Sequence, residues 1–227
     1  MTRRLSIAVN VILISFLGWY FLVHKDIRGY YQRHFDPRED FLEDIYYKAA
    51  VDSYAALNAS AKEARAVIAG DSIAAQFPIC ELLPEAGALN RGIGSDTSRG
   101  VLQRLDRNVN NLRISKFYLL VGHNDLKYRS VEETALNISL IFSRVQATEK
   151  YFISVLPAAD PGRDLLIREL NEEVRRASLA GSFRYIDLYG KFLGSGGTIN
   201  QRLFYDGVHP AADGYKILAE GLRDSLR

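Results

Sequence analysis

Four short polar clusters contain the residue types that ester hydrolysis would need. They are Gly-Asp-Ser at 70–72, NRGIGSDT at 90–97, GHND at 122–125 and DGVHP at 206–210. A serine hydroxyl becomes an effective nucleophile when an imidazole takes its proton, and a carboxylate is needed to fix the tautomer of that imidazole. Ser72, His209 and Asp206 could fill these three roles.

The same clusters offer hydrogen-bond donors for a negatively charged reaction intermediate. Backbone amides in a glycine-rich turn and the side-chain amide of an asparagine can stabilise the oxyanion of a tetrahedral intermediate. The turn that contains Gly94 and Ser95 provides the first kind of donor, and Asn124 provides the second.

Alternating apolar and amphipathic segments predict how these clusters are positioned. Runs typical of strands occupy 64–70, 87–93, 115–122, 150–158 and 183–189. Segments with helical periodicity lie at 98–112, 130–146, 162–179 and 211–226. The alternation predicts a parallel sheet covered by helices on both faces. In such sheets the reactive groups gather beyond the carboxyl ends of the strands.

The ordered set of clusters resembles the four signature blocks of the SGNH hydrolases, also called the GDSL esterase/lipase family, over residues 64–227. The resemblance implies an α/β fold, a three-layer α/β/α sandwich with a central, mostly parallel five-stranded sheet of flavodoxin-like type. It also implies hydrolysis through an acyl-serine intermediate without a metal or other cofactor. By the same resemblance Ser72 is the nucleophile, His209 the base and Asp206 the residue that orients the base.

The resemblance further implies an oxyanion hole made by the backbone amides of Ser72 and Ser95 and the side chain of Asn124, with Gly94 supporting the turn. Ser95 stands where the family has a glycine, and a positive φ would cost a serine about 1 kcal/mol. His123 stands where the family more often has a threonine. His123 is expected to have a structural or substrate-facing role, with a share in proton transfer as the alternative.

Each cluster also has an explanation without catalysis. Ser72 could be a helix N-cap, and Asp71 is expected to be a turn and capping residue. Asp206 and His209 could mark the start of the last helix. The pair Gly92 and Gly94 resembles a dinucleotide loop only faintly, because Thr97 replaces the third glycine.

Composition excludes several other classes of protein. The 29 basic and 27 acidic residues nearly balance, and no basic run interleaved with aromatics indicates a nucleic-acid partner. A single cysteine, Cys80, excludes an internal disulfide and is expected to be a buried thiol. No Cys/His cluster indicates a structural zinc site. The oligomeric state stays open.

The N-terminal segment departs from this average, because residues 5–23 carry no charge and are long enough to cross a bilayer. Residues 1–23 are interpreted as a membrane anchor, with a cleaved signal or a core helix as alternatives. Basic residues lie on both sides of the span, so the cytoplasmic orientation stays open beside the favoured extracytoplasmic one.

A charged connector at 24–63 follows this anchor and leads into the hydrolase domain at 64–227. Part of the connector is expected to form a helix that packs on that domain through its apolar positions, which are Phe41, Ile45, Ala49 and Tyr54.

Together these features predict a single-pass membrane-anchored serine esterase that removes a short, acetyl-like acyl group from a small-molecule or glycan ester of the cell envelope. A lysophospholipase or thioesterase of the same fold is the nearest alternative. A non-catalytic, membrane-tethered glycan-binding module is the alternative from another class. Fold resemblance by itself does not specify the substrate.

Overall fold

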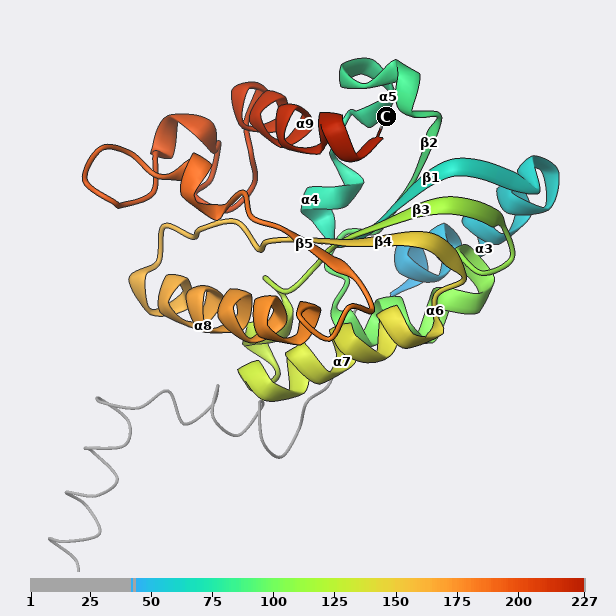
Figure 1. Cartoon of the computed structure of the whole chain (residues 1–227), viewed down its shortest axis with the longest axis horizontal. Helices are drawn as coiled ribbons and strands as arrows, with labels where there is room; N and C mark the ends of the chain where they lie inside the picture. The colour runs from blue at the N-terminus through green and yellow to red at the C-terminus, as the bar shows by residue number, and fades with distance from the viewer. Residues whose placement is uncertain (1–41, 43, 227) are drawn as a thin grey trace, which may run out of the picture. The chain divides into compact units, whose positions relative to one another are not determined.

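A parallel five-stranded sheet organises the chain, with strand order β2-β1-β3-β4-β5 (Figure 1). The computed structural model describes residues 42 and 44–226. The strands are β1 (Glu63–Gly70), β2 (Ala88–Gly92), β3 (Arg113–Leu120), β4 (Ala147–Ile153) and β5 (Arg184–Ile186). All four neighbouring pairs run parallel, which confirms the sheet expected from the sequence.

Helices cover both faces of this sheet. On one face lie α4 (Ser72–Ala75), α5 (Ile79–Leu82) and α9 (Ala212–Leu226), and on the other lie α3 (Ile45–Ala61), α6 (Ser98–Asn108), α7 (Val131–Arg144) and α8 (Pro161–Ser178) (Figure 1). Short 3₁₀ turns complete the described fold, namely η2 (Pro84–Ala86), η3 (Asp125–Lys127), η4 (Tyr189–Phe192) and η5 (Gln201–Leu203).

Two apolar cores fill the space between the sheet and its helices. Ala66 and Ile68 of β1 pack with α4, α5 and α9, whereas Val67 and Ala69 pack with α6, α7 and α8. All four residues have no exposed surface. Successive side chains of a strand point to opposite faces, so a strand covered on both sides needs an unbroken apolar run.

Side chains that cap helix N-termini define where three helices begin. Thr97, Ser130 and Asp160 accept hydrogen bonds from backbone N–H groups in the first turns of α6, α7 and α8. Pro161 occupies the first position of α8, where a missing N–H costs nothing. Each cap satisfies a donor that the helix itself leaves without a partner.

The helix expected in the connector is present as α3, but only part of its expected apolar face packs on the domain: Tyr54 does, two positions do not, and Phe41 lies outside the described residues. Ile45 is 74% exposed and Ala49 is also exposed, whereas Tyr47, Val51 and Asn58 are buried. Tyr47 and Val51 pack against Ile93, and Tyr47 and Asn58 also have buried polar partners that apolar spacing does not reveal. This helix belongs to the compact unit that spans residues 39–227.

Asn58 of α3 is the partner of a buried arginine in β2. Its Oδ1 accepts hydrogen bonds from Nε and Nη2 of Arg91 at 3.0 and 2.6 Å. Its Nδ2 donates to the Asn108 carbonyl and to Asn111 Oδ1. Burial lowers the pKa of Arg91, because desolvation disfavours the charged guanidinium.

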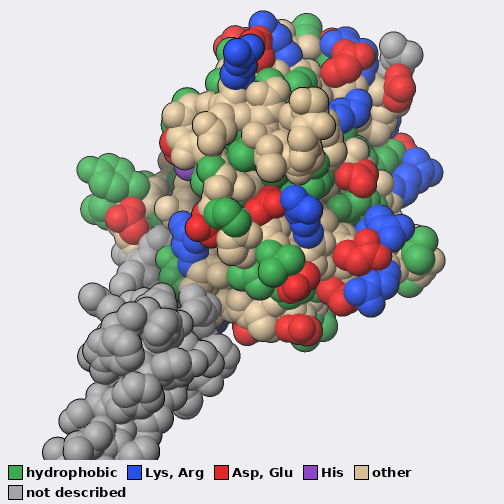
Figure 2. Space-filling view, turned by 90° about the vertical axis from the view of Figure 1, so that its left-hand side faces the viewer, with side chains coloured by type: hydrophobic (Ala, Val, Ile, Leu, Met, Phe, Trp, Pro, Cys, Tyr) green, Lys and Arg blue, Asp and Glu red, His purple; other side chains and the backbone are tan. Residues whose placement is uncertain are grey.

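Two further expectations concern the surface and the N-terminus. Cys80 is exposed rather than buried, because the short helix α5 that carries it lies at the surface, and its thiol donates to the Ala88 carbonyl at 3.7 Å. The expected membrane span at 5–23 lies outside the described residues. Within the described part, no helix combines the length and the apolar character needed to cross a bilayer. Figure 2 shows basic and acidic side chains interspersed on one face.

The Asn58–Arg91 contact yields a stability prediction. Asn58→Ala leaves two N–H groups of a buried guanidinium without an acceptor, so we expect the free energy of unfolding to fall by about 2–3 kcal/mol. Urea denaturation of both proteins measures this difference. Asn137→Ala, at a half-buried position of α7, is the matched control and should change stability little. Equal losses in the two variants would contradict the prediction.

Candidate active site

Strand register brings three of the four clusters to one edge of the sheet. Gly70, the last residue of β1, pairs with Gly92 at the end of β2 and with Leu120 at the end of β3. Two hydrogen bonds extend this register beyond the strands, from Asp71 N–H to the Leu120 carbonyl and from Ile93 N–H to the Gly70 carbonyl. The residues that follow these strands therefore lie at the same edge.

Gly70 and Asp71 determine where Ser72 is placed. A Cβ at Gly70 would lie 1.8 Å from the Leu120 carbonyl oxygen, so only glycine allows β1 and β3 to approach each other this closely. Asp71 caps α4 by accepting from the Ile73 N–H at 2.9 Å, which confirms its expected capping role. Ser72 is therefore the first residue of α4 rather than its N-cap.

The fourth cluster forms a turn that is fastened to the segment after β4. A bridge between Phe204 and Pro210 closes the turn. Gly207 has a φ of +80°, and its carbonyl accepts from the Ala159 N–H at 2.9 Å. A Cβ at Gly207 would lie 2.7 Å from the Ala159 side chain. Glycine thus permits both the turn and its close contact with the sheet edge.

Ser72, His209 and Asp206 form one line of hydrogen bonds. The hydroxyl oxygen of Ser72 lies 2.8 Å from Nε2 of His209, although the two residues are 137 positions apart. Nδ1 of His209 lies 2.6 Å from Oδ2 of Asp206. With Asp206 accepting from Nδ1–H, Nε2 is left as the acceptor for the serine hydroxyl.

Asp206 is held in the charged form that this line requires. Desolvation opposes the charge, but hydrogen bonds from the backbone and ring of His209 and from the Val208 N–H outweigh it, so the pKa of Asp206 is lowered. The carboxylate therefore acts as an acceptor at neutral pH. Its other oxygen shapes the turn that presents the imidazole.

Two backbone amides and one side-chain amide are available as oxyanion donors. Within the described chain, the N–H groups of Ser72 and Ser95 donate to no protein acceptor. The Asn124 side chain is 9% exposed, and its Nδ2 donates one hydrogen bond, to the Asp96 carbonyl at 3.1 Å. The second N–H of this amide remains for a ligand. The three groups follow β1, β2 and β3, and they therefore lie at the same edge.

Ser95 has the unfavourable backbone conformation that the sequence raised as a concern. Its φ is +63°, in the left-handed region where a side chain costs about 1 kcal/mol. Gly94 does not share this conformation, and a Cβ there would meet nothing within 4 Å. Strain of this kind persists only where the surrounding structure enforces it.

His123 lies beside the site, and burial keeps its ring neutral at neutral pH. It is 3% exposed, and its ring nitrogens form no hydrogen bond of normal geometry with the described residues. Burial lowers the pKa of His123 to about 3, and the positive charge of Arg163 acts in the same direction. The neutral ring favours a structural role over a share in proton transfer.

Tyr205 is a residue of the site that the sequence reasoning missed. Its ring stacks on the His209 imidazole with centroids 5.5 Å apart and planes inclined by 13°. Its hydroxyl donates to Gln76 Oε1 at 3.0 Å, which ties the histidine turn to the end of α4. An aromatic residue immediately before the DGVHP cluster was the available signal.

A buried network around Asp96 was also missed. Nε of Arg104 lies 2.7 Å from Asp96 Oδ2, and the Tyr47 hydroxyl donates to Asp96 Oδ1 at 3.1 Å. Burial and the Asp96 carboxylate raise the pKa of Tyr47, so its hydroxyl stays protonated and remains a donor. The available signal was Arg104 itself, a charge on the apolar stripe of the 98–112 helix between Val101 and Leu105.

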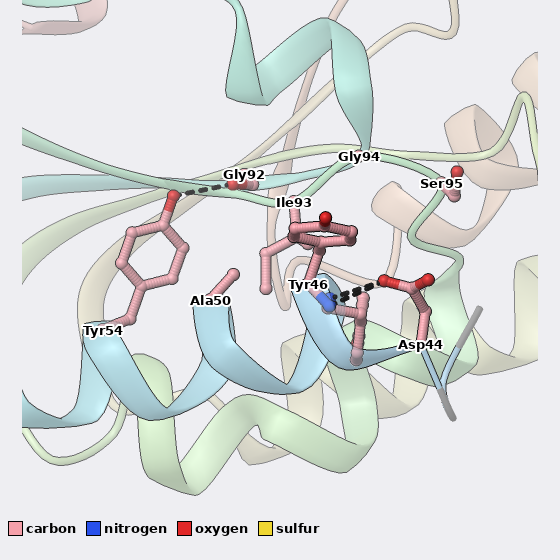
Figure 3. Close-up of a pocket in the computed structure, with 9 residues that line it drawn as sticks. Asp44, Tyr46, Ala50, Tyr54, Gly92, Ile93, Gly94 and Ser95 are labelled. Atoms are coloured by element: carbon pink, nitrogen blue, oxygen red, sulfur yellow. Dashed lines mark hydrogen bonds between the residues drawn. The ribbon is translucent and has the colours of Figure 1, made fainter.

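A pocket of about 680 Å³ opens between α3 and the loop after β2 (Figure 3). The α3 side is formed by Asp44, Tyr46, Tyr47, Ala50 and Tyr54, and the loop side by residues 92–95. The Tyr54 hydroxyl donates to the Gly92 carbonyl at 2.9 Å and so joins the two sides. The pocket therefore borders the loop that carries the Ser95 amide.

The serine–histidine–aspartate line at the carboxyl edge of a parallel sheet defines a hydrolase-type site. Within the described residues, no group of three or more His, Cys, Asp or Glu side chains is placed to hold a metal ion. The chain belongs to the GDSL-like lipase/acylhydrolase family, whose profile matches residues 52–217. This finding confirms the family and the hydrolase class expected from the four clusters.

Known proteins agree with this assignment. Platelet-activating factor acetylhydrolase IB subunit alpha1 of Homo sapiens is 30% identical over 178 residues, which are 73% of this chain and 76% of that protein. A GDSL-like lipase of Bacteroides thetaiotaomicron superposes with a TM-score of 0.67 at 25% identity, covering 78% of this chain and 96% of that one. A catalytic variant of an acetylxylan esterase from Geobacillus stearothermophilus shares the fold, with a TM-score of 0.59 at 14% identity over 72% and 94% of the two chains.

Asp71 gives the free energy of unfolding a pH dependence that can be measured. Complete burial raises its pKa from the ordinary 3.8 to about 7. An acid with a raised pKa binds more protons when folded, so Asp71 makes the fold less stable as pH rises between these two values and adds no slope above them. Asp71→Asn keeps an oxygen for the Ile73 N–H. We expect this variant to exceed the wild type in stability at about pH 8 and to lose the advantage toward about pH 4.

Urea unfolding of both proteins at several pH values tests this expectation. Titrating groups that do not interact with Asp71 contribute equally to both proteins and cancel in the difference. Asp213→Asn, at an exposed position of α9, is the control. A difference in stability that does not vary between about pH 4 and pH 8 would show that Asp71 has no raised pKa.

Proposed function

We propose that this hydrolase is a membrane-anchored serine esterase that removes acetyl or similarly short acyl groups from glycans of the cell envelope. The observation that carries the proposal is the line from Ser72 through His209 to Asp206, with contacts of 2.8 and 2.6 Å. Such a line lets a neutral hydroxyl attack a carbonyl carbon without prior ionisation.

In the proposed mechanism each step is carried out by one of these groups. The hydroxyl oxygen of Ser72 bonds to the ester carbonyl carbon while its proton passes to Nε2 of His209, and the imidazolium is stabilised by Asp206. The resulting oxyanion accepts hydrogen bonds from the Ser72 and Ser95 amides and from Asn124. The imidazolium then protonates the departing alcohol, which leaves an acyl-serine.

Hydrolysis of the acyl-serine repeats these steps with water. His209 takes a proton from the water, whose oxygen bonds to the acyl carbon, and the same donors hold the second oxyanion. Collapse of this intermediate breaks the bond to Ser72, and His209 returns the proton to the serine oxygen. The products are a carboxylic acid and the regenerated site.

A short acyl group is supported by the comparisons. The relative that is 30% identical is named an acetylhydrolase, and a structure of the same fold is named an acetylxylan esterase. Nothing in the described chain resembles an extended apolar lid that would shelter a long acyl chain.

A glycan as the alcohol part is supported by the pocket beside Ser95. The exposed Tyr46 and the half-buried Tyr54 offer aromatic faces on which the C–H groups of a sugar ring can pack. Asp44 and Ser95 place polar groups at the same pocket, where sugar hydroxyls need partners (Figure 3).

An acetylated phospholipid is the second candidate, favoured by the name of the 30% identical relative. The glycan candidate, unlike the phospholipid candidate, requires a sugar ring in the pocket between α3 and the loop at 92–95. A glycan ester would contact the aromatic side chains of this pocket, whereas a small chromogenic ester would contact only the catalytic residues.

Substrate panels separate these candidates. We expect Ser72→Ala to lose at least about 10³-fold in turnover of 4-nitrophenyl acetate, and a fluorophosphonate to add its mass at Ser72. We expect Tyr46→Ala to lower kcat/KM for acetylated xylooligosaccharides about tenfold and to leave 4-nitrophenyl acetate unchanged. Ile45→Ala, also exposed on α3 but outside the pocket, is the control.

The other outcomes are equally informative. Faster turnover of an acetylated phospholipid than of any glycan ester would favour the lipid candidate. A folded protein that turns over no acetyl to octanoyl ester would favour a binding module instead. A fluorophosphonate adduct on another serine would overturn the assignment of the nucleophile.

The membrane anchor and the extracytoplasmic position rest on the uncharged segment at 5–23. Alkaline phosphatase fused after residue 227 should be active, because that reporter folds only outside the cytoplasm. A green fluorescent reporter at the same position should stay dark after export through the general secretory route. The opposite pair of results would place the esterase in the cytoplasm.

A further inference from the structure

The side-chain amide of Asn124 forms one hydrogen bond as a donor and one as an acceptor. Its Nδ2 donates to the Asp96 carbonyl at 3.1 Å, and its Oδ1 accepts from the Lys127 ammonium at 2.8 Å. A carbonyl cannot donate and an ammonium cannot accept, so a rotated amide would lose both bonds and face two repulsive contacts. The amide therefore has one stable orientation.

We propose that Lys127 is a positioning residue of the oxyanion hole, which holds the Asn124 amide so that its free N–H faces the reacting carbonyl oxygen. The inference rests on the proposed esterase function. The contact with Lys127 is charge-assisted, and at 2.8 Å it is the shorter of the two bonds that orient the amide. Lys127 acts on the reaction through Asn124 and needs no contact with the substrate.

Local backbone geometry explains why a lysine at this position reaches the amide. Lys127 is the last residue of η3, and its N–H donates to the Asn124 carbonyl at 3.0 Å. Residues three apart in such a turn lie on the same side. The side chain of Lys127 can therefore fold back over the asparagine that begins the turn.

The charges around Lys127 come from three neighbouring segments. Arg163 of α8 is close enough to repel it, Asp71 after β1 attracts it, and His123 after β3 stays neutral. From α7, Glu133 pairs with Arg129 instead. Lys127 as a whole is exposed, but partial desolvation of its ammonium and the charge of Arg163 lower its pKa despite the attraction by Asp71.

A double-mutant cycle with Asn124 tests the inference, using the full-length chain and 4-nitrophenyl acetate. Lys127→Met should lower kcat about 10-fold to 100-fold with little change in KM, and Asn124→Ala should lower it about 10²–10³-fold. If Lys127 acts through Asn124, adding Lys127→Met to Asn124→Ala should lower kcat by less than about twofold. The rate of inactivation by a fluorophosphonate should follow the same pattern.

Two outcomes would overturn the positioning role while the wild type remains active. The first is an equal loss from Lys127→Met in both backgrounds, and the second is no loss in either. Absence of wild-type turnover would instead count against the proposed function. Lys216→Met, an exposed lysine of α9 paired with Asp213, is the control and should keep wild-type kinetics. If Lys127→Met fails to fold, Lys127→Ala carries the same cycle.

A pH profile gives a readout that a structural role would not produce. Arginine keeps its charge where a lysine of lowered pKa loses it. We expect Lys127→Arg to regain most of the activity lost in Lys127→Met. We also expect the arginine variant to keep its kcat at alkaline pH, where kcat of the wild type declines. A folded Lys127→Arg variant that recovers no activity over Lys127→Met would contradict the inference.

Discussion

The active site depends on the buried ion pair and hydrogen bonds of Asp96. The Asp96 carboxylate pairs with Arg104 at 2.7 Å, and neither side chain is more than 3% exposed. A charge without a partner in such a place would cost several kcal/mol, so the groups around Asp96 have little freedom to move apart. The backbone carbonyl of Asp96 accepts a hydrogen bond from the Asn124 side chain, so Asp96 is connected directly to one of the oxyanion donors.

Hydrogen bonds around this carboxylate connect segments that are distant in the chain. Arg104 reaches the carbonyl of Gly70 at the end of β1, and Tyr47 brings α3 to the same carboxylate. A donor displaced by about 1 Å can lose much of its effect on an oxyanion, so this rigidity matters for catalysis. The helix before the sheet is thereby part of the scaffold of the active site.

Three departures from ordinary local rules lie at this one edge of the sheet. Ser95 has a left-handed backbone, His123 is a buried imidazole without a well-formed hydrogen bond, and Asp71 is a buried acid with its pKa raised to about 7. Each of these departures lowers stability. Outside this edge, Lys62 at the end of α3 also has a positive φ, of +59°. Strain that is concentrated beside a nucleophile is typical of sites where function outweighs stability.

The sequence by itself determined the five strands, the helices between them and the serine, histidine and aspartate that the structure brings together. These features depend on periodicity and on short-range chemistry, such as the three-residue spacing of Asp206 and His209, which one chain segment encodes. Only the tertiary structure decided which face of α3 is buried, that Lys127 touches Asn124 and that Tyr205 stacks on His209. Those outcomes depend on contacts between side chains that are distant in the sequence. The pattern of residues along one segment does not specify these contacts, because they form only when strand register brings the segments together.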